Sequence, residues 1–600
     1  MKNLFLLTLL GTSALFAQSK KWTIAVYLCA DNNLESAGIE DFNEMESTID
    51  TSKYNVFVLL DRIPGYDNSN GNWTDTRLYR VLPDANSSTI GSQLLKDCGE
   101  LNMGDPDNIA WFMDTVALLS QTDEYWLVLW NHGDGWKMLP DKDVCFDDTD
   151  NDEISVSGGE LNDALRQCFT ILGENLGIIS YDACLMGLLE VEYETKDYAD
   201  VTMHSQETEP GDGYPYEDIL SWLNSHPDAT PQELATNAAD LYAQSYPSYY
   251  GVTQSAVDMG PWYTRFYLAV DEFARELIKA GGKGNSSIYN ALDNTTSFTY
   301  NSYRDLYDFA RRIQATSSLP ASLRTAAQRV MDLQGDGFIG DTTLLGHFES
   351  GYPGAHGITI YGPTSSPNSS YSSLYWVPNS AWHWFIQGRS SLPSEARITY
   401  WYNSRGDSIG YGDNIDFTVD LLNAGGSDLS NVSATISTID PYVTVLNSSA
   451  SYGTIASEAT VTSAGSYVVN ISPSVPQGHR ISFFLDITGS GGYSNTTSFN
   501  IIATGSPVGV CEGSGVPQDI VLLPLGNPVK GRAEISFATT GAAKASLVAY
   551  DATGRQISVL YQGQEAGTHS VYWNPPKSGT YFLRLQEADR GKTVRLISVQ

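Results

Sequence analysis

The 600-residue sequence is poor in cysteine and in positive charge, and it has no long apolar run beyond its first residues. Six cysteines in a chain of this length do not make a disulfide scaffold, and none of them has the close spacing of a zinc site. Lys and Arg total 34 against 70 Asp and Glu, giving a net charge of −36. This balance excludes a nucleic-acid partner, because phosphate binding needs a cationic surface. No later run approaches the ~20 apolar residues of a membrane-spanning helix.

The apolar run at the start of the chain has the pattern of a secretory signal. A lysine at position 2 precedes Leu4–Leu10, and small residues follow up to Ala17. This arrangement predicts a signal peptide over residues 1–17. We therefore expect a mature protein that is secreted or held at the cell surface, with no transmembrane segment.

Between residues 18 and 391, apolar runs alternate with helical patterns, which is typical of an α/β domain with a mostly parallel sheet flanked by helices. The runs that predict strands are Trp22–Ala30, Tyr54–Asp61, Thr76–Val81, Tyr125–Asn131, Leu176–Tyr181 and Val201–Gln206. Helical patterns lie between them at Asn33–Met45, Asp107–Leu119, Ser157–Cys168 and Leu185–Tyr193. Residues 230–316 are expected to be mainly helical, and Gly354–Pro363 to be a late strand that returns to the domain.

The last third of the chain has strand patterns only. Residues 392–504 carry alternating strands separated by turn residues, which predicts an Ig-like β-sandwich. Residues 505–520 have the composition of a Gly/Pro/Ser linker and hold the isolated Cys511. Residues 521–600 have the pattern of a second small all-β module.

Two of the predicted strands end in side chains that can do chemistry. The run from Tyr125 ends in His132 on a glycine turn, and the run from Leu176 ends in Asp182 and Cys184. Because sites form at the carboxyl ends of parallel strands, neighbouring strands would place this imidazole and this thiol side by side. Either residue alone is more often structural, since a free cysteine is commonly just buried. A histidine followed roughly 50 residues later by a cysteine is the order found in caspases, and it favours a catalytic pair.

At these residues the chain resembles the clostripain family of cysteine peptidases, which has the caspase-haemoglobinase fold. The matching segments lie within residues 21–390 and are Tyr27–Leu34, Leu129–Trp136, Tyr181–Gly187 and Glu207–Tyr216. The last module resembles the sorting domain of type IX secretion at Asn527–Val529, Tyr550–Arg555 and Ser578–Arg584. This second resemblance implies the type IX secretion machinery as a partner.

The clostripain resemblance implies roles for five residues. Cys184 is the nucleophile, and His132 is the base or charge partner that then protonates the leaving amine. The backbone N–H groups of Gly133 and Cys184 form the oxyanion hole. Asp182 and Asp212 match an acidic pocket that takes Arg or Lys before the cleaved bond, since a carboxylate at a pocket floor favours a cation.

Two alternatives concern these assignments. Asp182 alternatively caps a helix that begins at Cys184, a role that is compatible with a place in the pocket. The base is alternatively one of four other histidines, which are His204, His347, His356 and His383.

The segment between the two catalytic strands is acidic. Asp148, Asp150 and Asp152 alternate as in a calcium-binding loop, although Glu153 stands where an EF-hand has glycine. Some clostripain relatives need calcium, so the resemblance implies a calcium site here, and a solvated acidic loop is the alternative. The peptide-bond chemistry itself requires no cofactor. Nearby Lys137 and Lys142 are candidate points of self-cleavage for an enzyme that cuts after Lys.

The sequence therefore predicts a secreted cysteine endopeptidase that cleaves protein or peptide substrates after Arg or Lys by a Cys–His dyad. Two other functions stay open at this point. One is a secreted binding or adhesion protein on a catalytically idle peptidase fold. The other is a peptidase with the same mechanism and a different pocket preference.

Overall fold

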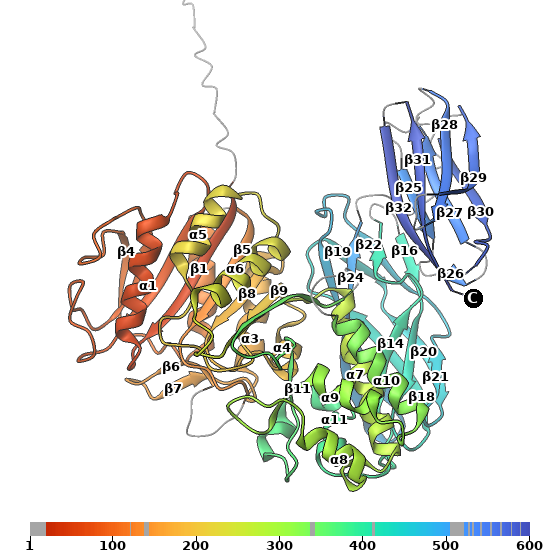
Figure 1. Ribbon diagram of the computed structural model, residues 1–600, viewed down its shortest axis with the longest axis horizontal. Helices are drawn as coiled ribbons and strands as arrows, with labels where there is room; N and C mark the ends of the chain where they lie inside the picture. Colours follow the sequence, from red (N-terminus) through yellow and green to blue (C-terminus); the bar gives the residue numbers. More distant parts are fainter. Residues whose placement is uncertain are drawn as a thin grey trace, which may run out of the picture. The chain divides into compact units, whose positions relative to one another are not determined.

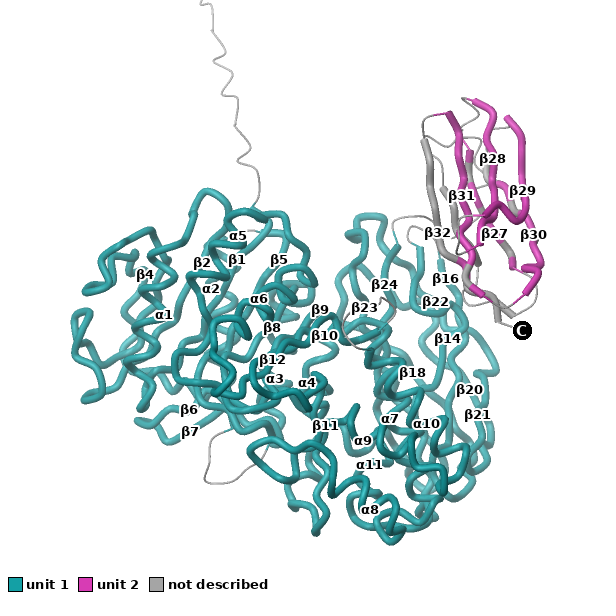
Figure 2. The backbone as a smooth tube through the Cα atoms, viewed as in Figure 1, with its two compact units in different colours: residues 1–508 teal, residues 509–600 magenta. Residues whose placement is uncertain are grey.

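The computed structural model describes residues 20–504 apart from residues 121, 137–142, 336–341 and 411–413, and it describes most of residues 521–600. The gaps in the last segment are residues 526–528, 531–532, 540–542, 552–554, 565–566, 578, 589 and 600. The predicted signal peptide and linker, Lys137 and Lys142 lie outside the described residues. The chain forms two compact units, residues 1–508 and 509–600 (Figure 2). Within the described residues, no helix is long and apolar enough to cross a membrane.

The first unit contains a nine-stranded sheet (Figure 1). Its strands are β1 (Lys20–Ala30), β2 (Asn55–Arg62), β3 (Thr76–Arg80), β4 (Gln93–Gly99), β5 (Thr122–Trp130), β8 (Leu176–Asp182), β9 (Ala199–His204), β10 (Val252–Asp258) and β12 (Leu344–Ser350). Their order across the sheet is β12-β10-β9-β8-β5-β1-β2-β3-β4. The middle strands β9, β8, β5, β1 and β2 run parallel, and antiparallel strands flank them on both sides.

Helices cover both faces of this sheet, because the side chains of a parallel strand alternate between two buried faces. In β1, Trp22 and Ile24 pack in the apolar core of one face, and Ala25 and Tyr27 pack in the core of the other. The first face is covered by α1 (Glu35–Thr48), α5 (Tyr216–Ser225) and α6 (Pro231–Ser245), and the second by α2 (Pro106–Leu119) and α3 (Glu160–Leu172). The predicted α/β domain with a mostly parallel sheet is confirmed.

The expected late strand is present but is shorter than Gly354–Pro363. Within Gly354–Pro363 only Thr359–Tyr361 (β13) is a strand, and it pairs with Tyr303–Asp305 (β11) in a separate two-stranded sheet. The chain returns to the central sheet earlier, at β12, which already occupies the edge beside β10. A small hairpin, β6 (Val144–Asp147) and β7 (Asp152–Ile154), lies in the segment between β5 and β8.

The first unit also contains helices other than those named above. They are α4 (Leu189–Thr195), α7 (Pro261–Lys279), α8 (Ser286–Asp293), α9 (Leu306–Ala315), α10 (Ala321–Gln334) and α11 (Trp382–Ile386). Three short 3-10 turns, η1 (Gly282–Gly284), η2 (Ser369–Ser373) and η3 (Val377–Asn379), connect them.

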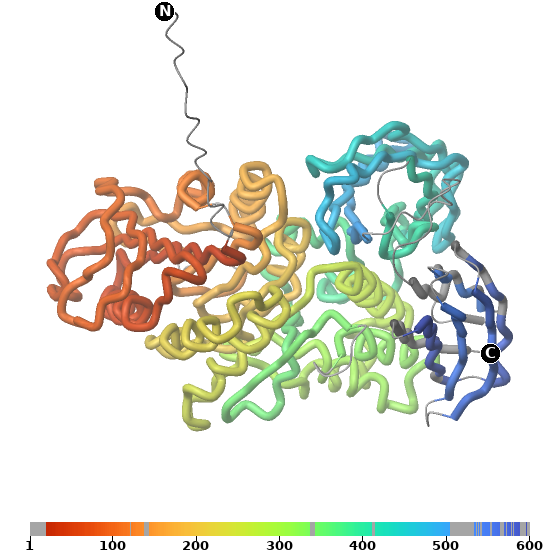
Figure 3. The backbone as a smooth tube through the Cα atoms, turned by 90° about the horizontal axis from the view of Figure 1, so that it is seen from above, coloured from red at the N-terminus to blue at the C-terminus, as the bar shows by residue number. Residues whose placement is uncertain are grey.

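In residues 398–410 and 414–503 the regular elements are strands and one 3-10 turn, η4 (Ser490–Gly492). The strands are β14 (Ile398–Asn403), β15 (Ser408–Ile409), β16 (Asn414–Phe417), β17 (Val419–Asn423), β18 (Leu429–Ser437), β19 (Val443–Asn447), β20 (Ser449–Ile455), β21 (Thr460–Thr462), β22 (Tyr467–Ile471), β23 (Arg480–Gly489) and β24 (Tyr493–Ala503). They pair as β14-β17-β21, β15-β24-β23-β18-β20 and β16-β22-β19. This all-β region packs beside α7 (Figure 3), where the Tyr267 hydroxyl donates to the carbonyl of Ser498 at 2.9 Å. Arg480 also pairs with Asp200 at 3.0 Å, so the strands and the preceding domain make one compact unit.

The second unit is also built from strands. They are β25 (Val521–Leu525), β26 (Val529–Lys530), β27 (Ala533–Thr539), β28 (Ala545–Asp551), β29 (Gln556–Gly563), β30 (Gly567–Trp573), β31 (Gly579–Glu587) and β32 (Arg590–Val599). They form the sheets β25-β27-β30 and β26-β32-β31-β28-β29 around a core that includes Phe537, Leu547 and Leu583. The predicted all-β modules are therefore present at the end of the chain.

Candidate active site

The register of the central sheet places the predicted nucleophile beside the predicted base. β5 and β8 are parallel neighbours in which Trp130 pairs with Asp182. His132 and Cys184 each follow two residues after this pair, and the N–H of Asn131 donates to the carbonyl of Asp182 at 3.2 Å. Both side chains line one cavity at the carboxyl edge of the sheet. The prediction that the two strands are neighbours is confirmed.

Gly133 is a glycine because the nucleophile's turn lies against it. A Cβ at this position would overlap the carbonyl oxygen of Cys184 and lie 3.0 Å from the Cβ of Ala183. The backbone of Gly133 also forms a bridge to Val144 at the start of the small hairpin. The backbone of Gly133 therefore lies against that of Cys184, and its part in an oxyanion hole stays a prediction.

The Cys184 thiol lies in a tight turn between β8 and α4. Its Sγ accepts a hydrogen bond from the backbone N–H of Glu209 at 3.2 Å. Burial raises the pKa of the thiol, and the hydrogen bond from Glu209 acts in the opposite direction. The next residue, Leu185, has a left-handed backbone with a φ of 62°, a conformation that costs about 1–2 kcal/mol for a residue with a side chain. The N–H of Leu185 donates to the carbonyl of Glu207 at 3.1 Å, and this bond holds the turn.

The conformation of this turn also tests the predicted role of Asp182 as a helix cap. The helix expected from Leu185 begins only at Leu189, because a left-handed residue cannot continue a right-handed helix. The alternative that Asp182 caps a helix starting at Cys184 is therefore wrong.

The His132 ring has a partner on the neighbouring strand end. Its Nε2 lies 2.9 Å from the side-chain oxygen of Asn33, an exposed residue between β1 and α1. A neutral ring that donates from Nε2 carries its basic lone pair on Nδ1. The sequence did not single out Asn33 as a site residue, although it belongs to the segment Tyr27–Leu34.

Two of the rival histidines are buried in other surroundings. His204 is fully inaccessible, and its Nε2 lies 2.8 Å from the carboxylate of Glu192. His347 is hydrogen-bonded to the Ser255 hydroxyl at 2.9 Å, and burial lowers its pKa to about 4. Neither lines the cavity that holds Cys184.

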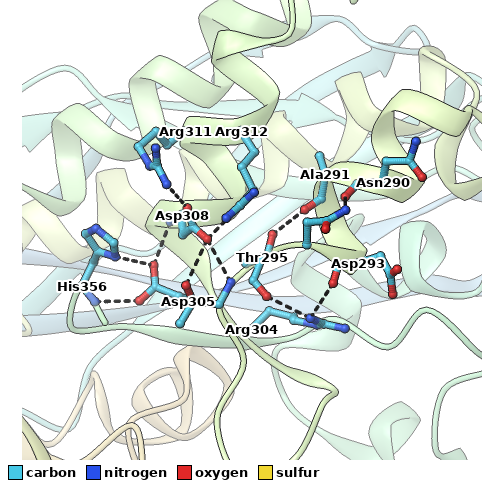
Figure 4. Close-up of polar contacts among 12 residues, drawn as sticks. Asn290, Ala291, Asp293, Thr295, Arg304, Asp305, Asp308, Arg311, Arg312 and His356 are labelled. Carbon is cyan, nitrogen blue, oxygen red and sulfur yellow. Dashed lines mark hydrogen bonds and ion pairs between the residues drawn. The ribbon is translucent and has the colours of Figure 1, made fainter. Parts of the chain in front are cut away.

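The other two rivals also lie elsewhere. His356 pairs with Asp305 at 3.0 Å in a network that extends to Asp308 and its arginines (Figure 4). Burial lowers the pKa of His383 to about 4. All five candidate histidines lie in the described part of the chain, and His132 is the one that shares a cavity with the thiol.

Asp182 is one of two carboxyl groups in the cavity wall. It is buried, and it accepts hydrogen bonds from the Tyr216 hydroxyl at 2.9 Å and from the N–H of Tyr214 at 3.3 Å. Burial raises the pKa of Asp182 to about 7. Asp212 is placed differently, because it is exposed and does not line the cavity, although Gly211 and Gly213 on either side of it do.

Glu209 is the second carboxyl group, and sequence reasoning missed it. Its Oε1 accepts from the Gln254 amide at 3.4 Å, while Oε2 is sealed from solvent without a donor among the described residues. Its carboxyl is hydrogen-bonded to that of Asp182, and burial followed by the charges of Asp182 and Cys184 raises its pKa well above the usual value. Two neighbouring carboxyls repel each other when both are ionised, so their proximity favours a proton on one of them.

Asp148 and Asp150 lie in the turn of the small hairpin between β6 and β7, and Asp152 begins β7. Asp148, Asp150 and Asp152 are all exposed there. The Asp152 carboxylate accepts a hydrogen bond from Asn102 at 2.6 Å. A calcium site made by these three residues stays a prediction.

A thiol and an imidazole at neighbouring strand ends, beside an acidic cavity, are the parts of a cysteine peptidase site. The model of the Clostripain family matches residues 26–386 of the chain. The chain therefore belongs to the clostripain family, and it is a cysteine-type endopeptidase.

Individual relatives are distant. The chain is 24% identical over 454 residues to "Clostripain" from Hathewaya histolytica, covering 66% of this chain and 81% of that protein. It is similar to the structure of a secreted C11 cysteine protease from Bacteroides thetaiotaomicron bound to an irreversible peptide inhibitor, with 22% identity, 61% and 99% of the two chains covered, and a TM-score of 0.45. It is also similar to an inactive zymogen C11 protease from Parabacteroides distasonis, with 17% identity, 60% and 97% covered, and a TM-score of 0.43.

Proposed function

We propose that the protein is an exported endopeptidase that cleaves peptide bonds after Arg or Lys with a Cys184–His132 dyad. The observation that carries this proposal is one cavity lined by the thiol, the imidazole and two buried carboxyls, Asp182 and Glu209. A preference for a substrate with Arg or Lys directly before the cleaved bond also fits the relationship to clostripain.

In the proposed reaction His132 takes the thiol proton, and the Cys184 thiolate attacks the carbonyl carbon of the peptide bond. The N–H groups of Gly133 and Cys184 donate to the oxyanion that forms. The C–N bond then breaks, His132 gives its proton to the leaving amine, and a thioester remains on Cys184. A water molecule that loses its proton to His132 attacks this thioester, which releases the acid product and restores the thiol.

The pocket selects a cation because its charge is otherwise uncompensated. Among the described residues, the charges that act on Glu209 are those of other acidic groups, and no ion pair is formed by Asp182 or Glu209. An Arg or Lys side chain would displace the shared proton and meet two carboxylates. A neutral side chain would leave the proton in place and would gain no charge-assisted contact with the pocket. Asp212 would add negative charge at the rim.

Export rests on two parts of the chain. Residues 1–17 have the signal pattern, and residues 521–600 resemble a type IX sorting domain. The strands β25–β32 form a compact unit of their own, as expected for a sorting signal that is removed after export.

A panel of fluorogenic peptides that differ only in the residue before the cut tests the proposal. We expect efficient cleavage after Arg and Lys and none by Cys184→Ala. A preference for a large apolar residue or Asp would favour a peptidase with a different pocket. No hydrolysis of any peptide by the mature protein would favour a binding protein on an idle fold.

A further inference from the structure

Two buried cysteines that take no part in the proposed reaction lie in contact with each other. Cys29 lies on β1 and Cys145 on β6, and both are fully inaccessible to solvent. The structure holds both as free thiols, and their side chains are hydrogen-bonded to each other. Among the five cysteines in the described part of the chain, no other pair is recorded in contact. Neither Cys29 nor Cys145 lines the catalytic cavity.

Two side-chain amides hold the backbones of these strands close together. The Asn32 amide nitrogen donates to the carbonyl of Cys29 at 3.0 Å and to the carbonyl of Phe146 at 3.2 Å. The Asn131 amide spans the same two carbonyls, at 2.5 and 2.9 Å. One nitrogen reaches both carbonyls only when the two backbones are close neighbours. The approach of the thiols is therefore fixed by two side chains from different segments.

The backbone at Cys145 does not itself favour a cysteine. Its φ is 56°, in the left-handed region that glycine adopts freely and that is unfavourable for a residue with a side chain. Val144, just before it, forms the bridge to Gly133, so the conformation is fixed beside the catalytic turn. A thiol at this position is explained by its contact with Cys29 and not by the local backbone.

We propose that Cys29 and Cys145 form a disulfide when the protein folds under oxidising conditions. Both S–H bonds break and one S–S bond forms, while two electrons and two protons reduce an oxidising disulfide, such as oxidised glutathione, to two thiols. Burial raises the pKa of Cys29, and the hydrogen bond with Cys145 adds to this effect. A buried and protonated thiol reacts slowly, so the bond forms before the core closes. The proposed export would supply the oxidising compartment.

The disulfide would join the end of β1 to β6 directly behind the catalytic base. Asn131, whose amide spans the two strands, immediately precedes His132. In the sequence, Lys137 and Lys142 fall between the two cysteines. A chain cut after either lysine would carry Cys29 and Cys145 on separate fragments, and the bond would keep these fragments covalently joined.

Refolding of full-length Cys184→Ala protein, a background that cannot digest itself, tests the proposal. The reduced, unfolded chain would be refolded either in mixed oxidised and reduced glutathione or in excess dithiothreitol. Free thiols would then be alkylated in denaturant and located by peptide mass mapping. We expect Cys29 and Cys145 to be joined in the glutathione sample and alkylated in the other. The oxidised protein should have a Tm at least ~3 °C higher, because the bond restricts the unfolded chain.

Free Cys29 and Cys145 in the folded glutathione sample, or a bond from either to another cysteine, would overturn the proposal. This result does not depend on export or on peptidase activity, so it is separate from a failure of the proposed function. Protein isolated from an exporting strain and alkylated without refolding gives the same answer if refolding is inefficient.

Variants in the same background assign the stabilisation to this bond. Cys145→Ala should abolish the Tm difference between the two refolding conditions and leave Cys29 open to alkylation. Cys29→Ala is the second variant, used if Cys145→Ala fails to fold. The control is Cys98→Ala, which removes a half-buried thiol and should keep both the bond and the full Tm difference. A Tm difference in Cys145→Ala equal to that of the parent would contradict the assignment.

Discussion

Trp130 of β5 and Asp182 of β8 are register partners, so His132 and Cys184 lie equally far beyond the same pair of the parallel ladder. The peptidase chemistry depends on this relationship. A shift of one residue in register would turn one of the two side chains to the opposite face of the sheet. The register therefore brings the base and the nucleophile together before any substrate binds.

Gly133→Ala should lower kcat by ~10²–10³-fold while the protein stays folded. The added methyl group would overlap the carbonyl oxygen of Cys184 and push the proposed oxyanion-hole N–H away. Turnover and thermal unfolding would be measured together. Gly284→Ala is the matched control, because a Cβ at Gly284 meets nothing within 4 Å and should leave kcat unchanged. Near-normal turnover by Gly133→Ala would remove Gly133 from the mechanism.

Glu209→Gln and Asp182→Asn should each lower kcat/KM for Arg and Lys substrates by ~10–10³-fold and leave weak hydrolysis of neutral substrates almost unchanged. The reason is that each variant removes one buried carboxylate from the proposed pocket. Asp212→Asn should cost less than about fivefold, since an exposed charge is screened by water. The check is the ratio of kcat/KM values for peptides that differ in one residue. Equal losses on charged and neutral peptides would mean that these carboxyls support the site without selecting its substrate.

Selectivity for cations should increase with pH. Burial raises the pKa of Asp182 to about 7, so its carboxyl is neutral below that pH and gains the charge that a cation needs above it. The ratio of kcat/KM for an Arg peptide to that for a norleucine peptide should therefore rise as the pH increases through about 7. Titration of the thiol and the imidazole affects both peptides alike and cancels in the ratio. A ratio that stays constant across this range would contradict the shared-proton pocket.

Deletion of Leu523–Gln600 should trap active enzyme inside the cell envelope, because this module is the proposed address for type IX export. Peptidase activity would be assayed in the envelope and in the medium of a strain that has the secretion machinery. The full-length protein is the control. Unchanged release of the truncated protein would show that the module has another role.

The sequence predicts the middle of the sheet better than its edges, for a physical reason. Strands β1, β5 and β8 are buried on both faces and therefore appear as continuous apolar runs. β10 is also buried, but Thr253, Gln254 and Ser255 occupy its middle, so it carries no apolar signal. These polar side chains are tolerated because Thr253 and Ser255 bond to neighbours such as Ser205 and His347.

The candidate site was predictable where it depends on strand ends and unpredictable where it depends on loops. His132 and Cys184 follow directly from two apolar runs. The acidic pocket comes from the loop after β9, in which the backbone conformation decides that Glu209 points inward and Asp212 outward. In the same loop Glu207 turns away to bond the N–H of Thr299 at 3.2 Å. The spacing of these residues along the chain does not show whether their side chains point into the cavity or away from it.

The central claim is that Cys184 is the nucleophile and His132 its base, and covalent labelling tests it most directly. The mature protein would be treated with a peptidyl acyloxymethyl ketone that carries Arg next to the reactive group, and the modified residue would be located by peptide mass mapping. We expect the label on Cys184, no turnover by Cys184→Ala, and labelling and turnover at least ~10³-fold slower in His132→Ala. Label on Cys98, the other half-buried thiol in the described part of the chain, or normal turnover by Cys184→Ala would contradict the account.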